Sequence, residues 1–301
     1  MIDSLDQMVE QVLLKGKKFR IAIVWAHDIN TVYAVKRAVN HGIIEPVLMG
    51  IPDEIRKIFS NAGMNLTGFN IIPCETEEVA AAEAVRMVNA GEADIIMKGL
   101  LGTDKFLKSV MDKGSGLMNN DALLSFIGVI QIPSYKKLLF VTDPAVIPFP
   151  DYNQKMSMLK YAIEVARKFG ISSPKVALIG ASEKVSRHFP NSLEFDRIVK
   201  ETEGGKKLNC IVDGPLDLFL ACDPESVEIK GIKTPVNGDA DVLLFPALEA
   251  SNPFYKSLML FADGEIAGMI MGTKKPVVVM SRSESEKSKF YCIALSCLMA
   301  V

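Results

Sequence analysis

Short runs of apolar, mostly β-branched residues alternate along the chain with longer segments in which apolar residues recur every three or four positions. The short runs are typical of buried parallel strands, since a strand covered on both faces has no polar face to alternate with. We expect strands at 20–26, 45–50, 69–73, 93–99, 175–181, 209–214, 240–246 and 275–281. The longer segments predict helices at 30–41, 77–90, 103–112, 153–169, 252–261 and 284–299, opened by caps such as Asn30, Thr76 or Thr103.

This order of strands and helices predicts an α/β protein with helices on both faces of its sheets. One place breaks the alternation, where the strand-like runs 126–133 and 136–143 are joined only by a Pro-Ser-Tyr link. A link this short permits an antiparallel hairpin and no crossover helix. Three prolines within 144–150 then prevent either helix or sheet from continuing, so we place a domain boundary near residue 144.

Composition narrows the class of protein. The 301 residues suffice for about two domains at ~100–200 residues each. Apolar residues at 49% and charged residues at 23% indicate an ordinary globular protein, and the formal net charge of -2 gives no reason to expect a nucleic-acid partner. No run reaches the ~18 apolar residues of a membrane helix, and residues 1–10 are acidic where a secretion signal is basic. We therefore expect a cytoplasmic protein with no membrane partner.

Several kinds of site lack support in the sequence. The five cysteines are odd in number and form no CxxC pair, so we expect buried thiols and neither disulfides nor zinc. The histidines His27, His41 and His188 lie far apart without carboxylates at metal-binding spacing, so we expect no metal. The strand ends carry no GxGxxG, no Walker motif and no GxSxG, which disfavours nicotinamide enzymes, P-loop proteins and nucleophile-elbow hydrolases.

The end of the strand at 93–99 is a candidate substrate-binding segment, because ligands of open α/β sheets sit beyond the carboxyl ends of the strands. Lys98 and Gly99 stand at the strand tip, and Thr103 opens the next helix. Backbone amides combined with a lysine can hold a phosphate or a carboxylate. The same residues also suit a plain tight turn, so both interpretations stay open.

Two other strand ends carry polar residues in the same topological place. Ser182 and Glu183 follow the strand at 175–181, where simple packing is the competing explanation. Ser281 and Arg282 end the strand at 275–281, just before a helix, and the five donors of a guanidinium suit an anion at a helix N-terminus. An ion pair with a neighbouring glutamate is the alternative role for this arginine.

Taken together, several stretches resemble the phosphate acetyl/butyryltransferases, most closely the phosphate butyryltransferase branch. They are 98–113, 138–146, 211–221, 229–258 and 276–289. The resemblance covers nearly the whole chain in order. It implies two doubly wound α/β domains with a cleft between them, of the isocitrate/isopropylmalate-dehydrogenase-like type, formed by 1–143 plus 269–301 and by 144–268. It also implies a homodimer or higher homo-oligomer.

The resemblance further implies reversible transfer of a short acyl group between coenzyme A and inorganic phosphate, with no tightly bound cofactor and coenzyme A as a substrate. Arg282 would hold the phosphate, and Ser281 would hydrogen-bond the developing oxyanion or the departing sulfur. The acetyltransferases place a basic aspartate six residues after the arginine, where this chain has Ser288, so the base is unassigned and Glu284 is a weaker candidate. Lys108 falls where the acetyltransferases carry a substrate-binding arginine.

Four positions that are polar in the family pattern are apolar here. Met118, Phe126, Ile147 and Phe219 stand where arginine, histidine, asparagine and aspartate are expected. Either the acyl pocket has changed, or the chain is a catalytically weak paralogue that binds coenzyme A or acyl phosphate as a sensor or partner subunit. A dehydrogenase sharing the fold would need clustered aspartates at one strand end, and the aspartates of this chain are scattered.

Overall fold

The computed structural model describes residues 1–67, 69–281 and 283–300, and the chain folds as two compact units. Unit 1 consists of Met1–Ser4 and Ser125–Ile266, and unit 2 consists of Leu5–Leu124 together with the residues from Ala267 onward. The expected domains divided the chain at 143 and 268, whereas the units divide it at 124 and 266. The segment 125–143, which contains the hairpin, therefore belongs to unit 1.

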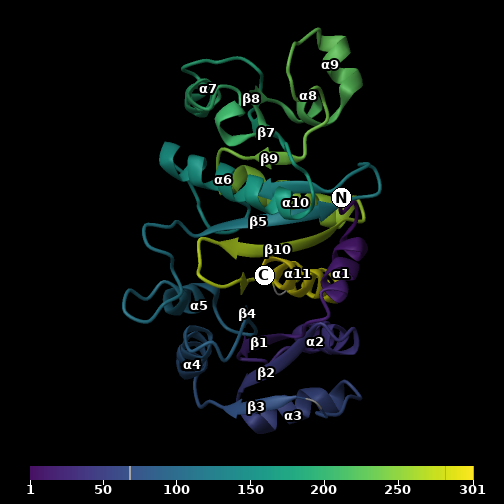
Figure 1. The fold of residues 1–301 in the computed structure, drawn as a ribbon, viewed down its shortest axis with the longest axis vertical. Coiled ribbons are helices and arrows are strands. Elements are labelled where there is room, and N and C mark those ends of the chain that lie inside the picture. Colours follow the sequence, from purple (N-terminus) through teal and green to yellow (C-terminus); the bar gives the residue numbers. More distant parts are fainter. Residues whose placement is uncertain (68, 282, 301) are drawn as a thin grey trace. The chain divides into compact units, whose positions relative to one another are not determined.

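Unit 2 contains a mainly parallel sheet with the strand order β3-β2-β1-β4-β11-β10 (Figure 1). Its parallel strands are β1 (Phe19–Val24), β2 (Ile44–Gly50), β3 (Asn70–Pro73), β4 (Ile95–Lys98) and β11 (Val277–Val278). The strand β10 (Glu265–Met271), which the sequence analysis did not anticipate, begins at the boundary with unit 1 and runs antiparallel to β11. The parallel strands confirm the sequence prediction for this part of the chain.

Helices cover both faces of the unit 2 sheet. In Figure 1 one face carries α1 (Leu5–Leu14), α2 (Ile29–Asn40), α3 (Pro52–Asn61) and α11 (Glu286–Met299), and the other carries α4 (Glu77–Asn89) and α5 (Thr103–Val110). The helix α11 packs against α1, α2 and β11 and is buried from Ser288 to Leu298. The sequence analysis did not anticipate α1 or α3.

The strands of unit 1 follow the order β5-β6-β9-β7-β8. Its strands are β5 (Ser125–Gln131), β6 (Leu139–Thr142), β7 (Lys175–Ile179), β8 (Ile211–Leu216) and β9 (Val242–Leu244). β5 and β6 pair antiparallel, which confirms the predicted hairpin, and the other neighbours pair in parallel. The helices are α6 (Tyr152–Lys168), α7 (Pro190–Glu201), α8 (Leu218–Cys222), α9 (Pro224–Lys230) and α10 (Leu248–Phe261), with a 3-10 helix at Lys206–Leu208.

Helix starts follow local side-chain chemistry. The Thr76 hydroxyl accepts a hydrogen bond from the backbone N–H of Val79 and caps α4, as predicted. The cap of α2 is Asp28, two residues before the expected Asn30, because its carboxylate accepts from the N–H of Thr31. Gly102, and not Thr103, is the cap residue of α5.

No disulfide joins the five cysteines, all of which lie in the described part of the chain. Cys74, Cys210, Cys292 and Cys297 are buried, as expected, and Cys222 is half-buried. Burial raises the pKa of Cys222 to about 11, since a thiolate is poorly solvated there. These thiols therefore serve as small apolar side chains at neutral pH.

Candidate functional site

The carboxyl ends of the parallel strands of unit 2 meet at one edge of the sheet, where ligands of such folds bind. We call this edge of the sheet the unit 2 carboxyl edge. Three loops leave it, at 25–28, 99–102 and 279–285. Six of the candidate site residues lie on it or on the helices that follow it directly: Lys98, Gly99, Thr103, Ser281, Glu284 and Ser288. Arg282, the strongest candidate from the sequence, lies outside the described residues.

Two of these loops are joined backbone to backbone. The N–H of Gly99 donates to the carbonyl of Val24, and the N–H of Leu100 donates to the carbonyl of Trp25, each at 2.8 Å. A Cβ atom at Gly99 would lie 2.4 Å from the Trp25 oxygen and 2.6 Å from the Val24 oxygen. Glycine is therefore required at 99 by the close approach of the β1 backbone.

Lys98 organises the loop that follows it. Its side chain is buried, and its ammonium donates to the carbonyl oxygens of Gly99 and Leu101, both at 3.0 Å. These bonds fold the loop back over the strand tip and deliver the chain to Thr103, which is exposed in the first turn of α5. The N–H groups of a first helical turn have no partners within the helix and can hold an anion.

The loop that precedes α11 is rich in hydroxyl groups. The Ser281 side chain lies 2.9 Å from the Ser283 hydroxyl, and the Ser281 carbonyl accepts from the N–H of Glu284 at 3.3 Å. Ser285 caps α11 by accepting from the N–H of Ser288 at 2.9 Å. Ser281 and Glu284 are partly exposed, whereas Ser288 is 1% exposed, which favours a packing role for Ser288 over direct contact with a substrate.

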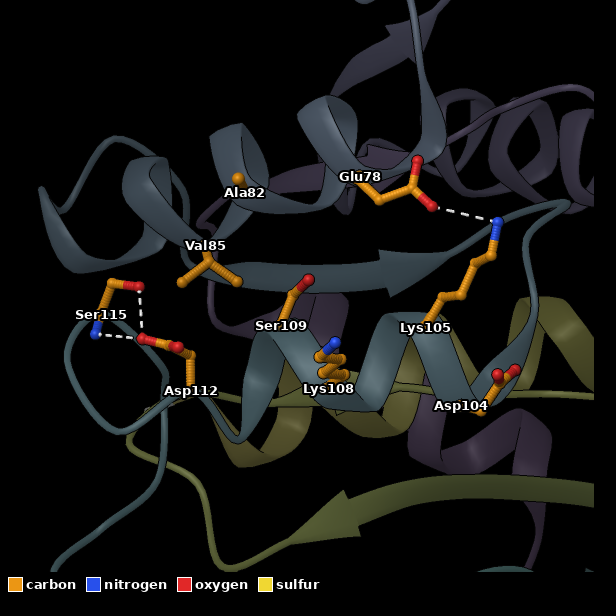
Figure 2. Close-up of a pocket in the computed structure, with 9 residues that line it drawn as sticks. All are labelled: Glu78, Ala82, Val85, Asp104, Lys105, Lys108, Ser109, Asp112 and Ser115. Atoms are coloured by element: carbon orange, nitrogen blue, oxygen red, sulfur yellow. Dashed lines mark hydrogen bonds and ion pairs between the residues drawn. The ribbon is translucent and has the colours of Figure 1, made fainter.

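Lys108 lies on α5 beside a cavity of about 590 Å³. Figure 2 shows residues of α4, α5 and the following loop around this cavity: Glu78, Ala82, Val85, Asp104, Lys105, Lys108, Ser109, Asp112 and Ser115. The Lys105 ammonium pairs with Glu78 at 3.0 Å, and Asp112 accepts from the backbone and the hydroxyl of Ser115. Lys108 thus brings an exposed ammonium to a polar cavity of a size that small-molecule sites commonly have.

Ser182 and Glu183 belong to unit 1, where they follow β7. The Ser182 hydroxyl accepts from the N–H of Lys184 at 3.2 Å and lies 3.4 Å from the Glu183 carboxylate. A Cβ atom at Gly180 would lie 3.0 Å from the Cβ of Pro215, so this turn is also tightly packed. Both side chains are partly exposed and available to a ligand at the carboxyl edge of the unit 1 sheet.

His27 is a residue of the unit 2 carboxyl edge that the sequence analysis had set aside. Its Nε2 accepts a hydrogen bond from the N–H of Ile51 at 3.0 Å, and its ring centroid lies 4.2 Å from that of Trp25. Burial lowers the pKa of His27, although Glu54 and Glu77 act in the opposite direction. With Nε2 accepting, the proton of the neutral ring lies on Nδ1. The signal in the sequence was its position in Trp-Ala-His-Asp, directly after a strand.

This geometry makes folding stability depend on pH through His27. Because the folded-state pKa lies below the unfolded value of about 6.5, the unfolded chain takes up a proton first as the pH falls. The contribution of neutral His27 is fully present above pH ~6.5 and is lost as the pH falls toward its folded-state pKa. We expect His27→Gln, whose amide oxygen can still accept from Ile51, to keep the stability at neutral pH within about 1 kcal/mol and to flatten its decline below pH ~6.5.

Thermal unfolding of both proteins from about pH 7.5 to pH 5 checks this expectation. All other titrating groups are common to the two proteins, so the difference between their curves isolates His27. Parallel curves would contradict it.

The four positions that depart from the family pattern occupy different surroundings. Phe126 and Ile147 are 5% and 6% exposed, and Phe219 is 67% exposed. The N–H of Phe126 donates to the buried carboxylate of Asp143 at 2.9 Å, and burial raises the pKa of Asp143. Met118 forms an isolated antiparallel bridge with Thr273. Two of the four replacements are therefore part of the core of unit 1.

Some features are missing from residues 1–67, 69–281 and 283–300. These segments contain no group of three or more His, Cys, Asp or Glu side chains placed to hold a metal ion. They also contain no helix whose length and apolar character would let it cross a bilayer.

Comparison with known proteins gives a consistent result. The family model for phosphate acetyl/butaryl transferase matches residues 76–297. The phosphate acetyltransferase of Thermotoga maritima is 38% identical over 296 residues, which cover 98% of this chain and 99% of that protein. The phosphate butyryltransferase of Clostridium acetobutylicum is 36% identical over 300 residues, with coverage of 100% and 99%.

Solved structures agree. A branched-chain phosphotransacylase from Enterococcus faecalis matches with a TM-score of 0.83 and 29% identity, over 94% of this chain and 99% of that one. The fold is the isocitrate-dehydrogenase-like α/β fold, which confirms the predicted fold class. The chain therefore belongs to the phosphate acetyl/butaryl transferase family, as its sequence motifs predict.

Proposed function

We propose that this protein transfers a short acyl group, of the acetyl or butyryl type, reversibly between coenzyme A and inorganic phosphate. A phosphate oxygen attacks the thioester carbonyl, the C–S bond breaks, and the products are an acyl phosphate and the coenzyme A thiolate, which takes up a proton. The match to the family model over 76–297 carries the proposal. Relatives named for acetyl and for butyryl transfer are nearly equally similar, so the acyl chain stays open between them.

The Ser281–Arg282 pair supplies the electrostatics of this mechanism. The guanidinium of Arg282 holds the phosphate by two parallel hydrogen bonds and offsets the charge of the tetrahedral intermediate. The Ser281 hydroxyl, partly exposed on the loop before α11, donates to the developing oxyanion or to the departing sulfur. Fixing two anionic substrates in line supplies much of the remaining acceleration.

The reverse direction requires a base, since the thiol of coenzyme A must lose its proton before it attacks. Glu284 is our candidate, because it is partly exposed and lies on the same loop, three residues after Ser281. Ser288 carries no carboxylate and is buried, so it is not our candidate for this base.

Other residues would bind coenzyme A. The loop after Lys98 offers the N–H groups of the first turn of α5 near Thr103, and the exposed Lys108 offers an ammonium to an anionic group in the cavity beside it. Ser182 and Glu183, which follow β7 in unit 1, are separate candidates for binding a substrate. The family resemblance also supports a homodimer and a location in the cytoplasm. Light scattering of the purified protein would test the oligomeric state.

The test is release of free thiol from acetyl-, propionyl-, butyryl- and isobutyryl-coenzyme A, with and without phosphate. Phosphate-dependent release is expected, and the substrate with the highest kcat/KM identifies the acyl class. We expect Ser281→Ala to lower kcat by about 10²–10³, the usual effect of one lost oxyanion donor. A protein that binds coenzyme A and yet releases no thiol from any of the four would refute the enzyme and favour the binding paralogue.

A further inference from the structure

Lys289 occupies an unusual place at the unit 2 carboxyl edge. It stands in the first turn of α11, directly after the loop that carries Ser281, and it is 4% exposed. Its Nζ lies 3.3 Å from a carboxylate oxygen of Asp28, the cap of α2 at the end of the β1 loop. The ammonium therefore lies where the starts of two helices come together at this edge.

This position is unfavourable for a cation unless an anion compensates it. The partial positive charge of a helix N-terminus repels an ammonium in the first turn, and burial removes water from it. The same Asp28 oxygen also accepts from the N–H of Thr31 at 2.8 Å, so it is shared between two donors. Among the described residues Asp28 is the one hydrogen-bond partner of the Lys289 ammonium, although an ammonium has three donors.

Two other buried lysines of the chain are better satisfied. Lys98 donates to two carbonyl oxygens at 3.0 Å, and Lys155 in unit 1 donates to Asn191 at 2.7 Å and pairs with Glu194. Both have partners that account for their burial. The contrast indicates that the remaining donors of Lys289 serve a ligand.

We propose that Lys289 binds phosphate oxygens of the acyl acceptor. The inference rests on the proposed function, since it assigns the ligand to the phosphate substrate of that reaction. Lys289 holds the anion from the side of α11 and α2. The ion pair between Lys289 and Asp28 is then part of the binding site and not only a structural contact. Inorganic phosphate and the phosphates of coenzyme A share this chemistry, and we assign the former.

Three variants test the proposal. Lys289→Met removes the charge and the donors, Lys289→Gln keeps a donor toward Asp28 without the charge, and Lys289→Arg keeps the charge. We expect Met and Gln to raise the KM for phosphate by about tenfold to a hundredfold, the usual size of a hydrogen bond to a charged group. The KM for acyl-coenzyme A should change less than about threefold, and Arg should recover most of the phosphate affinity.

Lys155→Met is the matched control, a buried lysine of unit 1. It should lower thermal stability and leave the KM for phosphate unchanged. Calorimetric titration with inorganic phosphate, coenzyme A and dephospho-coenzyme A gives a readout that needs no turnover. If the wild-type protein binds phosphate through Lys289 but transfers no acyl group, the proposed function fails, whereas the assignment of Lys289 to inorganic phosphate stands.

Unchanged phosphate binding in Lys289→Gln, with a loss of thermal stability alone, would overturn the inference and leave a structural ion pair. A loss confined to coenzyme A, and absent with dephospho-coenzyme A, would overturn it in favour of the 3′-phosphate. If Lys289→Met fails to fold, the Gln variant decides the question, because it keeps a hydrogen-bond donor in the side chain.

Discussion

Replacing Arg282 with alanine should lower phosphate-dependent thiol release by about 10²–10³-fold or more. The reason is chemical: a guanidinium offers two parallel donors to phosphate, and its loss leaves the charge of the tetrahedral intermediate without its main counterpart. Arg282→Lys should retain part of the activity, because an ammonium restores the charge but not the fork of donors. Initial rates at saturating acyl-coenzyme A and varied phosphate give kcat and KM separately.

The control for this variant is Arg56→Ala. Arg56 is an exposed arginine of α3 whose ion-pair partner among the described residues is Asp53, and its replacement should leave the rate unchanged. The single tryptophan of the chain, Trp25, lies at the unit 2 carboxyl edge and can report binding of coenzyme A by its fluorescence. Wild-type rates in Arg282→Ala would mean that phosphate is held elsewhere.

Gly99→Ala should destabilise the protein by about 1–3 kcal/mol and reduce activity with it. The new methyl group would lie 2.4 Å and 2.6 Å from two backbone oxygens of β1 and its loop, which no side-chain rotation can relieve. Either the 99–102 loop or the β1 loop must move, and the partners of the Lys98 ammonium move with it. Urea unfolding gives the free-energy change, and thiol release gives the loss of rate.

Gly114→Ala is a matched comparison within the same unit. A Cβ atom at Gly114 would meet only a carboxylate oxygen of Asp112, at an ordinary distance of 3.5 Å. We expect its unfolding free energy to lie within about 0.5 kcal/mol of the wild type. Equal unfolding free energies for Gly99→Ala and Gly114→Ala would contradict the tight packing of the 99–102 loop against the end of β1.

The sequence predicted best the elements with a clear pattern of apolar residues. The runs at 20–26 and 45–50 became β1 and β2 because apolar β-branched stretches are nearly unambiguous in a sheet covered on both faces. The strand β10 escaped prediction because Gly268 interrupts its apolar run. The helix α3 escaped because only two of its residues, Ile55 and Phe59, are buried, so its apolar stripe is narrow.

The sequence predicted which site residues lie at strand ends, but it did not predict the hydrogen-bond partners of these residues. The position of Lys98 followed from topology, but its bonds to Gly99 and Leu101 depend on how the loop folds back. His27 and Lys289 were missed for the same reason: their partners, Ile51 and Asp28, are 24 and 261 positions away along the chain. Only the folded sheet brings such residues together.

The return of the chain to unit 2 has a consequence for biosynthesis. Residues 265–300 contain β10, β11 and α11, and α11 is buried against α1 and α2, which are translated about 250–280 residues earlier. Unit 2 cannot complete its core until this segment has left the ribosome, whereas the 125–266 segment of unit 1 is already whole. We expect nascent chains stalled shortly after residue 266 has left the ribosome to show a protease-resistant unit 1 and a protease-sensitive unit 2. The N-terminal segment of unit 2 would therefore depend on chaperones for a longer time than unit 1.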